Sequence, residues 1–123
     1  MSAIEFVEHP FKVRVVFCTS AKEWREQCEW YKHDVPYPRQ CTAAVARLTF
    51  ARNSPVILVM ANRARLRRNG PAAIAEACAH EATHIMRYVC ENVGEQFLGW
   101  ESEAHLVGAI TRWMYKIVDG SVN

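Results

Sequence analysis

The chain has 123 residues, of which 50% are hydrophobic and 23% are charged. This length fits one domain with one core, and this composition excludes a disordered or fibrous protein. A net charge of +2 is too small to imply nucleic-acid binding by itself.

No apolar run approaches the roughly 20 residues that span a bilayer. Residues 1–10 also lack the basic start and apolar core of a signal peptide. The five cysteines are odd in number, widely spaced and never arranged as CxxC, so a disulfide framework is disfavoured. We therefore expect a cytoplasmic protein with free, mostly buried thiols and no membrane partner.

The first predicted elements are a strand and a helix. Residues 11–18 alternate and are rich in β-branched side chains, which favours a strand. Ser20 has the position of an N-cap, and Glu23 three residues later completes a capping box. The helix should run to about Tyr31 and is followed by a proline-broken loop at 34–38.

Two further strands are predicted next. Residues 41–50 alternate, the segment 52–55 has turn chemistry, and residues 56–61 form an apolar run typical of a strand buried on both faces. The two strands are expected to pair as an antiparallel hairpin.

The segment 62–70 is predicted as a basic loop. It contains four arginines and no acid, and Arg52 lies across the predicted hairpin; the four are Arg63, Arg65, Arg67 and Arg68. A solvated loop is the simpler interpretation. The alternative is a patch that attracts an acidic substrate or a nucleic-acid backbone.

Two helices complete the chain. Pro71 suits the first turn of a long helix, which should run to about residue 92 or 93 and end at Gly94. A short loop at 95–100 leads to a last helix from about Glu101 to Val118. We expect these strands and helices to form one domain of the α+β fold class.

The long helix carries His80-Glu81-Ala82-Thr83-His84, an HExxH motif. Positions four apart lie one turn above each other, so both imidazoles can bind one zinc ion, with Glu81 beside the metal-bound water. The residues from Ala72 to Ala79 are apolar nearly all round the helix, which predicts a central helix with other layers against most of it. The alternative is a pair of core histidines hydrogen-bonded to the backbone.

A catalytic zinc site needs a third protein ligand, and Glu101 and Glu103 are candidates. Glu103 continues the apolar face of the last helix, whereas Glu101 shares the polar face with His105 and Arg112. The apolar face comprises Leu106, Val107, Ile110, Trp113, Met114 and Ile117. We therefore predict Glu103 as the third ligand and treat Glu101 and His105 as surface residues. A first-turn glutamate favoured only by the helix dipole is the alternative for Glu103.

The metzincin pattern HExxHxxGxxH is excluded at two positions. Its glycine position holds Arg87, and its third histidine position holds Cys90. Without the glycine, the helix cannot turn to bring residue 90 to the metal.

The predicted mechanism is peptide hydrolysis. Zinc held by His80, His84 and Glu103 would lower the pKa of a bound water toward ~7 and polarise a carbonyl. Glu81 would take the proton as general base and return it to the leaving amine.

An oxyanion also needs a hydrogen-bond donor besides the metal, and Tyr88, Arg87 and Arg112 stay open as candidates. Tyr88 is more typical of a packing residue.

This arrangement resembles the gluzincin group of zinc metallopeptidases. Its Glu-x-Glu-Ala form at 101–104 is similar to the ImmA/IrrE-type peptidases, and with Gly94-Glu95 it resembles small phage- or prophage-encoded metallopeptidases. The resemblance covers about residues 72–113. It implies a zinc cofactor, a peptide or protein substrate bound to an edge strand, and a minimal zincin fold. That fold is a small twisted, mostly antiparallel sheet packed on a central zinc-binding helix and a C-terminal helix.

One residue departs from the gluzincin pattern, and this departure supports alternatives to peptidase activity. Larger gluzincins carry an aspartate four residues after the ligand glutamate, and here that position holds Val107. The alternative is therefore a catalytically weak or inactive zinc-stabilised binding or regulatory protein. A nucleic-acid-associated protein that uses the 63–68 loop is a third interpretation, because the basic loop beside HExxH is similar to SprT-like proteases.

Overall fold

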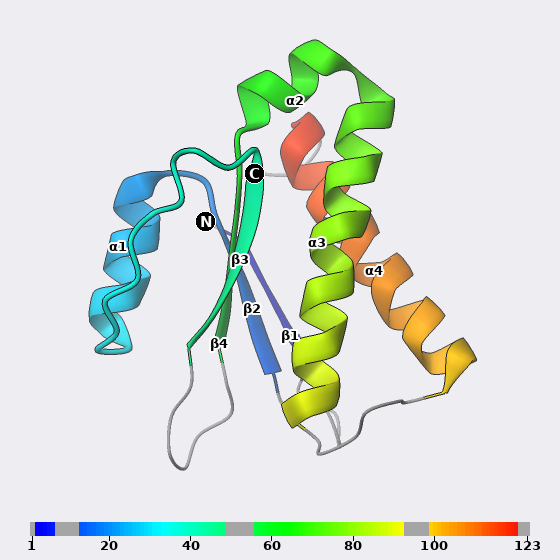
Figure 1. Cartoon of the computed structure of the whole chain (residues 1–123), viewed down its shortest axis with the longest axis horizontal. Coiled ribbons are helices and arrows are strands. Elements are labelled where there is room, and N and C mark those ends of the chain that lie inside the picture. Colours follow the sequence, from blue (N-terminus) through cyan, green and yellow to red (C-terminus); the bar gives the residue numbers. More distant parts are fainter. Residues whose placement is uncertain (1, 7–12, 49–55, 93–98, 121–123) are drawn as a thin grey trace.

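The computed structural model describes residues 2–6, 13–48, 56–92 and 99–120 (Figure 1). Its elements in chain order are β1 (Ser2–Phe6), β2 (Val13–Cys18), α1 (Ala21–Trp30), β3 (Ala43–Leu48), β4 (Val56–Ala61), α2 (Arg63–Asn69), α3 (Pro71–Asn92) and α4 (Trp100–Asp119). The α+β fold class predicted from the sequence is confirmed. The turn predicted at 52–55 and the helix end predicted at Gly94 lie outside the described residues.

The strands form one sheet in the order β1-β2-β4-β3. β3 and β4 pair antiparallel, with Val45 opposite Val59, which confirms the predicted hairpin. β1 and β2 are also antiparallel, whereas β2 and β4 are parallel, with Val15 opposite Ile57. The sheet is therefore mixed but mostly antiparallel, as the sequence predicted.

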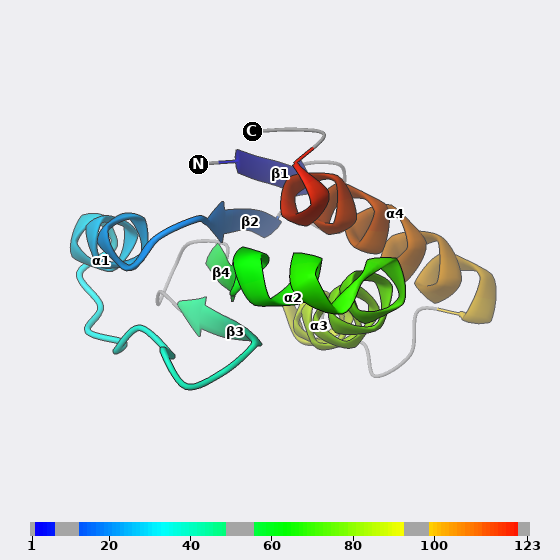
Figure 2. The same cartoon turned by 90° about the horizontal axis from the view of Figure 1, so that it is seen from above.

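Alternation along the strands divides the core between the two faces of the sheet. Val15 and Val59 face one cluster with α3 and α4, whereas Val16 and Leu58 face a second cluster with α1. Figure 2 shows α1 on one side of the sheet and α2, α3 and α4 on the other. Both faces of the two central strands are covered, so β4 is apolar along its whole length and β2 is apolar except at Arg14.

The helices α3 and α4 pack on each other and on the sheet. Ile85 and Val89 of α3 and Ile110 and Ile117 of α4 are fully buried between them. Burial of each such side chain contributes about 1.5–3 kcal/mol. This packing fixes the position of the HExxH turn relative to β3, because α3 lies over the β3 side of the sheet (Figures 1 and 2).

The predicted loop at 62–70 is wrong, because residues 63–69 form the helix α2. The Asn62 side chain caps it by accepting from the Arg65 N–H at 3.1 Å. Leu66 is 3% exposed and anchors the helix in the core, and Gly70 ends it at a φ of +97°. Arginine has a high helix propensity, so the charge run that indicated a loop is compatible with a short surface helix.

The strand β1 is an element that the sequence analysis did not predict. It pairs with β2, placing Ile4 opposite Val15 and Glu5 opposite Arg14.

The helix α3 is less enclosed than its apolar sequence indicated. Ala72, Ala75 and Ala79 are exposed, so this face of the helix has no layer over it. Alanine has the highest helix propensity and only a small apolar surface, so it is tolerated there. The prediction of a helix surrounded on most sides was wrong on this face, and the two histidines consequently lie at the surface.

The first helix begins as predicted, with one difference. The Ser20 hydroxyl accepts from the Glu23 N–H at 3.1 Å, as an N-cap should. The Glu23 carboxylate, however, accepts from the Thr19 N–H at 2.9 Å. In a standard capping box it would bond the N–H of the N-cap itself.

The prediction of free thiols is confirmed. All five cysteines are free, and only Cys41 is exposed. None of the helices in the described residues is long and apolar enough to cross a membrane.

Candidate metal centre

The HExxH turn of α3 brings two imidazoles into contact. The Nε2 atoms of His80 and His84 are 3.2 Å apart, and the ring planes are inclined at 73°. Two nitrogens bound about 2.0–2.1 Å from a tetrahedral zinc ion lie about 3.3–3.4 Å from each other. The separation of the histidines therefore fits two ligands of one zinc ion. A hydrogen bond between the rings accounts for the same contact without a metal.

Glu81 lies beside this pair but differs from it in burial. It is 6% exposed, whereas the His80 side chain is 67% exposed. Its Oε1 is 4.0 Å from the His80 Nε2. Burial raises the pKa of the Glu81 carboxyl, and the nearby His80 and His84 partly offset this effect. A carboxylate beside two imidazole nitrogens, with its proton affinity raised, has the properties of a general base.

A hollow of about 340 Å³ opens next to Glu81, between α3, α2 and the start of β3. His80 and Glu81 line it from α3, and Thr42 and Ala43 line it from the β3 side. β3 is the last strand in the sheet order, so its outer edge pairs with no other described strand. The hollow therefore joins the histidine pair to an open sheet edge. Thr42 and Ala43 were not predictable from the sequence, because only the strand order shows that residues near 43 meet the HExxH turn.

Glu103 faces inward, as its helical phase predicted. Its side chain is 16% exposed, whereas that of Glu101 is 89% exposed. The Glu103 Oε1 lies 3.9 Å from the Arg87 Nη1, one turn beyond His84. Glu101 instead lies 3.0 Å from His105 in an exposed pair. The structure therefore shows the predicted difference in burial, with Glu103 facing inward and Glu101 facing solvent.

The structure does not bring three ligands together. Within residues 2–6, 13–48, 56–92 and 99–120, no three His, Cys, Asp or Glu side chains are grouped so that they could hold a metal ion. His80 and His84 meet, but Glu103 lies against Arg87. The donor types are those of a catalytic zinc site. Of the three predicted ligands, only His80 and His84 lie together.

Three other residues considered in the sequence have identifiable surroundings. Tyr88 lies under Arg47, whose Cζ is 5.7 Å from the ring centroid, and it packs against the core. Cys90 is fully buried, which agrees with its rejection as a ligand. Val107 packs against the same core, so no carboxylate stands at this position to orient a histidine.

Comparison of the chain with protein-family models, with curated proteins and with solved structures gave no match. The side chains described above are therefore the basis for assigning a function.

Proposed function

We propose that this chain is a zinc-dependent peptidase in which His80 and His84 bind the metal and Glu81 is the general base. The observation that carries the proposal is the histidine pair at 3.2 Å with a buried carboxylate 4.0 Å from one of its nitrogens. A buried carboxylate is costly unless it is paired, so its position beside two metal-binding nitrogens favours a catalytic role.

Zinc would supply Lewis-acid polarisation of the substrate carbonyl and would make a water molecule more acidic. Glu81 accepts a proton from the attacking water, whose oxygen forms a bond to the carbonyl carbon. When the carbon–nitrogen bond breaks, the Glu81 carboxyl donates this proton to the leaving amine. Burial of Glu81 supports both steps, because a raised pKa brings the carboxyl nearer to the working pH.

Glu103 is the proposed third ligand, and it has to leave Arg87 to bind. The two are separated by 3.9 Å, which is longer than a direct hydrogen bond. Arg87, one turn beyond His84, is the proposed donor to the oxyanion. Tyr88 is less suited to that role, because it packs beneath Arg47.

The proposed substrate is an extended peptide that pairs with the outer edge of β3. Such pairing supplies main-chain hydrogen bonds and brings alternate side chains toward the hollow beside His80. The family proposed from the motif is the gluzincin group, including its small phage-encoded members. Five free thiols favour a reducing compartment such as the cytoplasm.

Metal analysis tests the site. Protein purified with zinc should hold about one equivalent, and His84→Ala and Glu103→Ala should each reduce this amount strongly. His105→Ala is the matched control, because His105 lies on the exposed face of α4 and should leave the zinc content unchanged. Less than about half an equivalent in the wild type, or zinc content unaffected by Glu103→Ala, would contradict the three-ligand assignment.

Hydrolysis of a peptide library tests the chemistry. Glu81→Gln should reduce the rate by at least about a hundredfold while zinc binding is retained. Equal rates for the two proteins would exclude Glu81 as the base. No cleavage by zinc-loaded wild type would favour the second candidate, a zinc-stabilised binding or regulatory protein, which Val107 and the Arg87–Glu103 contact support.

A further inference from the structure

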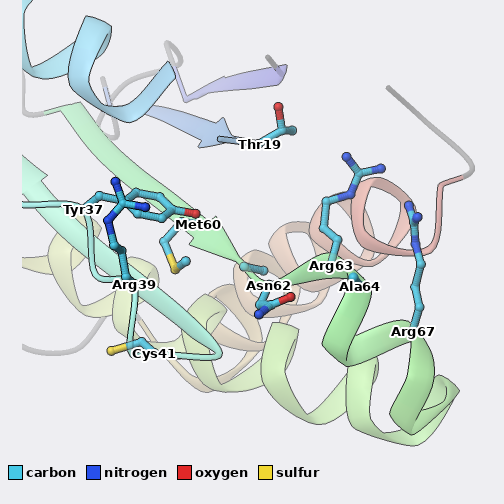
Figure 3. Close-up of a pocket in the computed structure, with 10 residues that line it drawn as sticks. Thr19, Tyr37, Arg39, Cys41, Met60, Asn62, Arg63, Ala64 and Arg67 are labelled. Atoms are coloured by element: carbon cyan, nitrogen blue, oxygen red, sulfur yellow. The ribbon is translucent and has the colours of Figure 1, made fainter. Parts of the chain in front are cut away.

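A second hollow of about 480 Å³ lies at the carboxyl ends of the parallel strands β2 and β4. After β2 the chain continues into α1 over one face of the sheet, and after β4 it continues into α2 over the other. The two backbones therefore diverge at Thr19 and Asn62 and leave a crevice between them (Figure 3). Crevices of this kind, outside the carboxyl ends of strands, are common ligand sites in sheets with parallel strands.

The lining of this hollow is basic. Arg39, Arg63 and Arg67 contribute to it, and none of the described residues that line it is acidic. Figure 3 shows Arg63 and Arg67 extending in the same direction from successive turns of α2, with Tyr37 and Arg39 on the opposite wall. Three arginine side chains from two separate segments therefore line one space.

Arg63 has one unsatisfied donor. Its Nε is buried and has no hydrogen-bond partner in the described part of the chain. A guanidinium group that is partly removed from water without a partner is unfavourable. An anion that pairs with the Arg63 guanidinium would offset part of this cost.

Arg39 and Arg67 are held in place by their neighbours. The Arg39 Cζ lies 5.6 Å from the Tyr37 ring centroid, and Tyr37 packs edge-to-face on Trp24 at 5.8 Å. The Arg67 Nε donates to the Val118 carbonyl at the end of α4, at 2.5 Å. These contacts restrict both side chains and reduce the entropy that they would lose on binding a ligand.

We propose that this hollow binds the phosphate group of a small phosphorylated molecule. Guanidinium groups form paired hydrogen bonds to phosphate oxygens, and three positive charges match a dianion better than a single carboxylate. A volume of about 480 Å³ leaves room for the group attached to the phosphate. The hollow shares no lining residue with the one at His80 and Glu81, so the proposal is independent of the peptidase function.

A nucleic-acid backbone fits the observations less well. Arg65 and Arg68, the other two arginines of α2, are exposed and do not line the hollow. Arg39 and Arg67 are also exposed, but together with Arg63 they line one hollow. A single phosphate can be contacted from this one space, whereas a nucleic-acid backbone would contact Arg65 and Arg68 as well. The two possibilities make different predictions for substitutions inside and outside the hollow.

The test is calorimetric titration of the full chain with inorganic phosphate and pyrophosphate at constant ionic strength. Arg63→Gln and Arg39→Gln should each weaken binding at least about tenfold, because each removes charged hydrogen bonds. Arg68→Gln, on the same helix but outside the hollow, should change the affinity by less than about twofold. Thermal unfolding of each variant checks that it is folded.

Cys41 provides a second measurement on the unmodified protein. It is exposed and lines the hollow, so bound phosphate should slow its alkylation. No binding at millimolar phosphate together with unprotected Cys41 would overturn the proposal, even if Arg63→Gln failed to fold. Equal loss of affinity in Arg63→Gln and Arg68→Gln, with tighter and steeply salt-dependent binding of a single-stranded oligonucleotide, would overturn it in favour of a nucleic-acid surface.

Discussion

Replacement of Glu81 by glutamine should make the metal-free protein more stable at neutral pH. Glu81 is 6% exposed, and its burial raises the pKa of the carboxyl above the ordinary 4.5. A raised folded-state pKa means that the folded protein favours the protonated carboxyl. The associated stability is fully present below about pH 4.5, the unfolded value, and is lost as the pH rises through the folded-state pKa. Glutamine does not titrate and avoids this loss.

The expected gain is about 1 kcal/mol at pH 7.5. Burial of a polar group without a good partner costs about 1–3 kcal/mol, and the lower end applies because Glu81 borders a hollow that water can enter. For a domain of this size, about 1 kcal/mol corresponds to a rise in Tm of roughly 3–5 °C. At pH 4 the wild-type carboxyl is protonated and similar in shape to the amide, so the difference should nearly vanish.

The assay is thermal unfolding of wild type and Glu81→Gln in the presence of a chelator, at pH 4 and pH 7.5. Glu76→Gln is the matched control, because Glu76 is an exposed residue on the same helix and should change stability by less than about 0.5 kcal/mol at either pH. A variant that is less stable than wild type at pH 7.5 would refute the reasoning. So would a difference of the same size at both pH values, since a titrating charge cannot produce it.

Three further predictions concern the fold. Ile110→Ala removes a fully buried side chain between α4 and the sheet and should lower the unfolding free energy by about 2–5 kcal/mol in a denaturant titration. Gly120→Ala places a Cβ at a left-handed residue that caps α4, at a φ of +93°, and should cost about 1 kcal/mol by the same measurement. Burial raises the pKa of Cys18 to about 12 and of Cys78 to about 11. Mass spectrometry after alkylation at pH 8 should therefore find Cys41 modified first, and stability should fall above about pH 9, where unfolded thiols ionise.

Elements with local signals were predictable from the sequence. The Ser20 N-cap, the hairpin of β3 and β4 and the long helix from Pro71 follow from capping residues, alternation and apolar periodicity, which depend only on neighbours in the chain. The inward phase of Glu103 was correct for the same reason. α2 was missed because its charge run gives no apolar period, and only the burial of Leu66 against the rest of the core reveals its anchored face.

The sequence by itself determined the α+β class and the contact of His80 with His84, because one helical turn separates them. It did not determine the surroundings of that pair. The exposure of the histidines, the burial of Glu81 and the contact of Glu103 with Arg87 depend on how α3 packs against β3 and α4. The basic hollow likewise unites residues near 39 with residues 63 and 67, because β2 and β4 run parallel and their connections leave on opposite faces. Such contacts between distant segments arise from the packing of the whole core, and no local pattern in the chain encodes them.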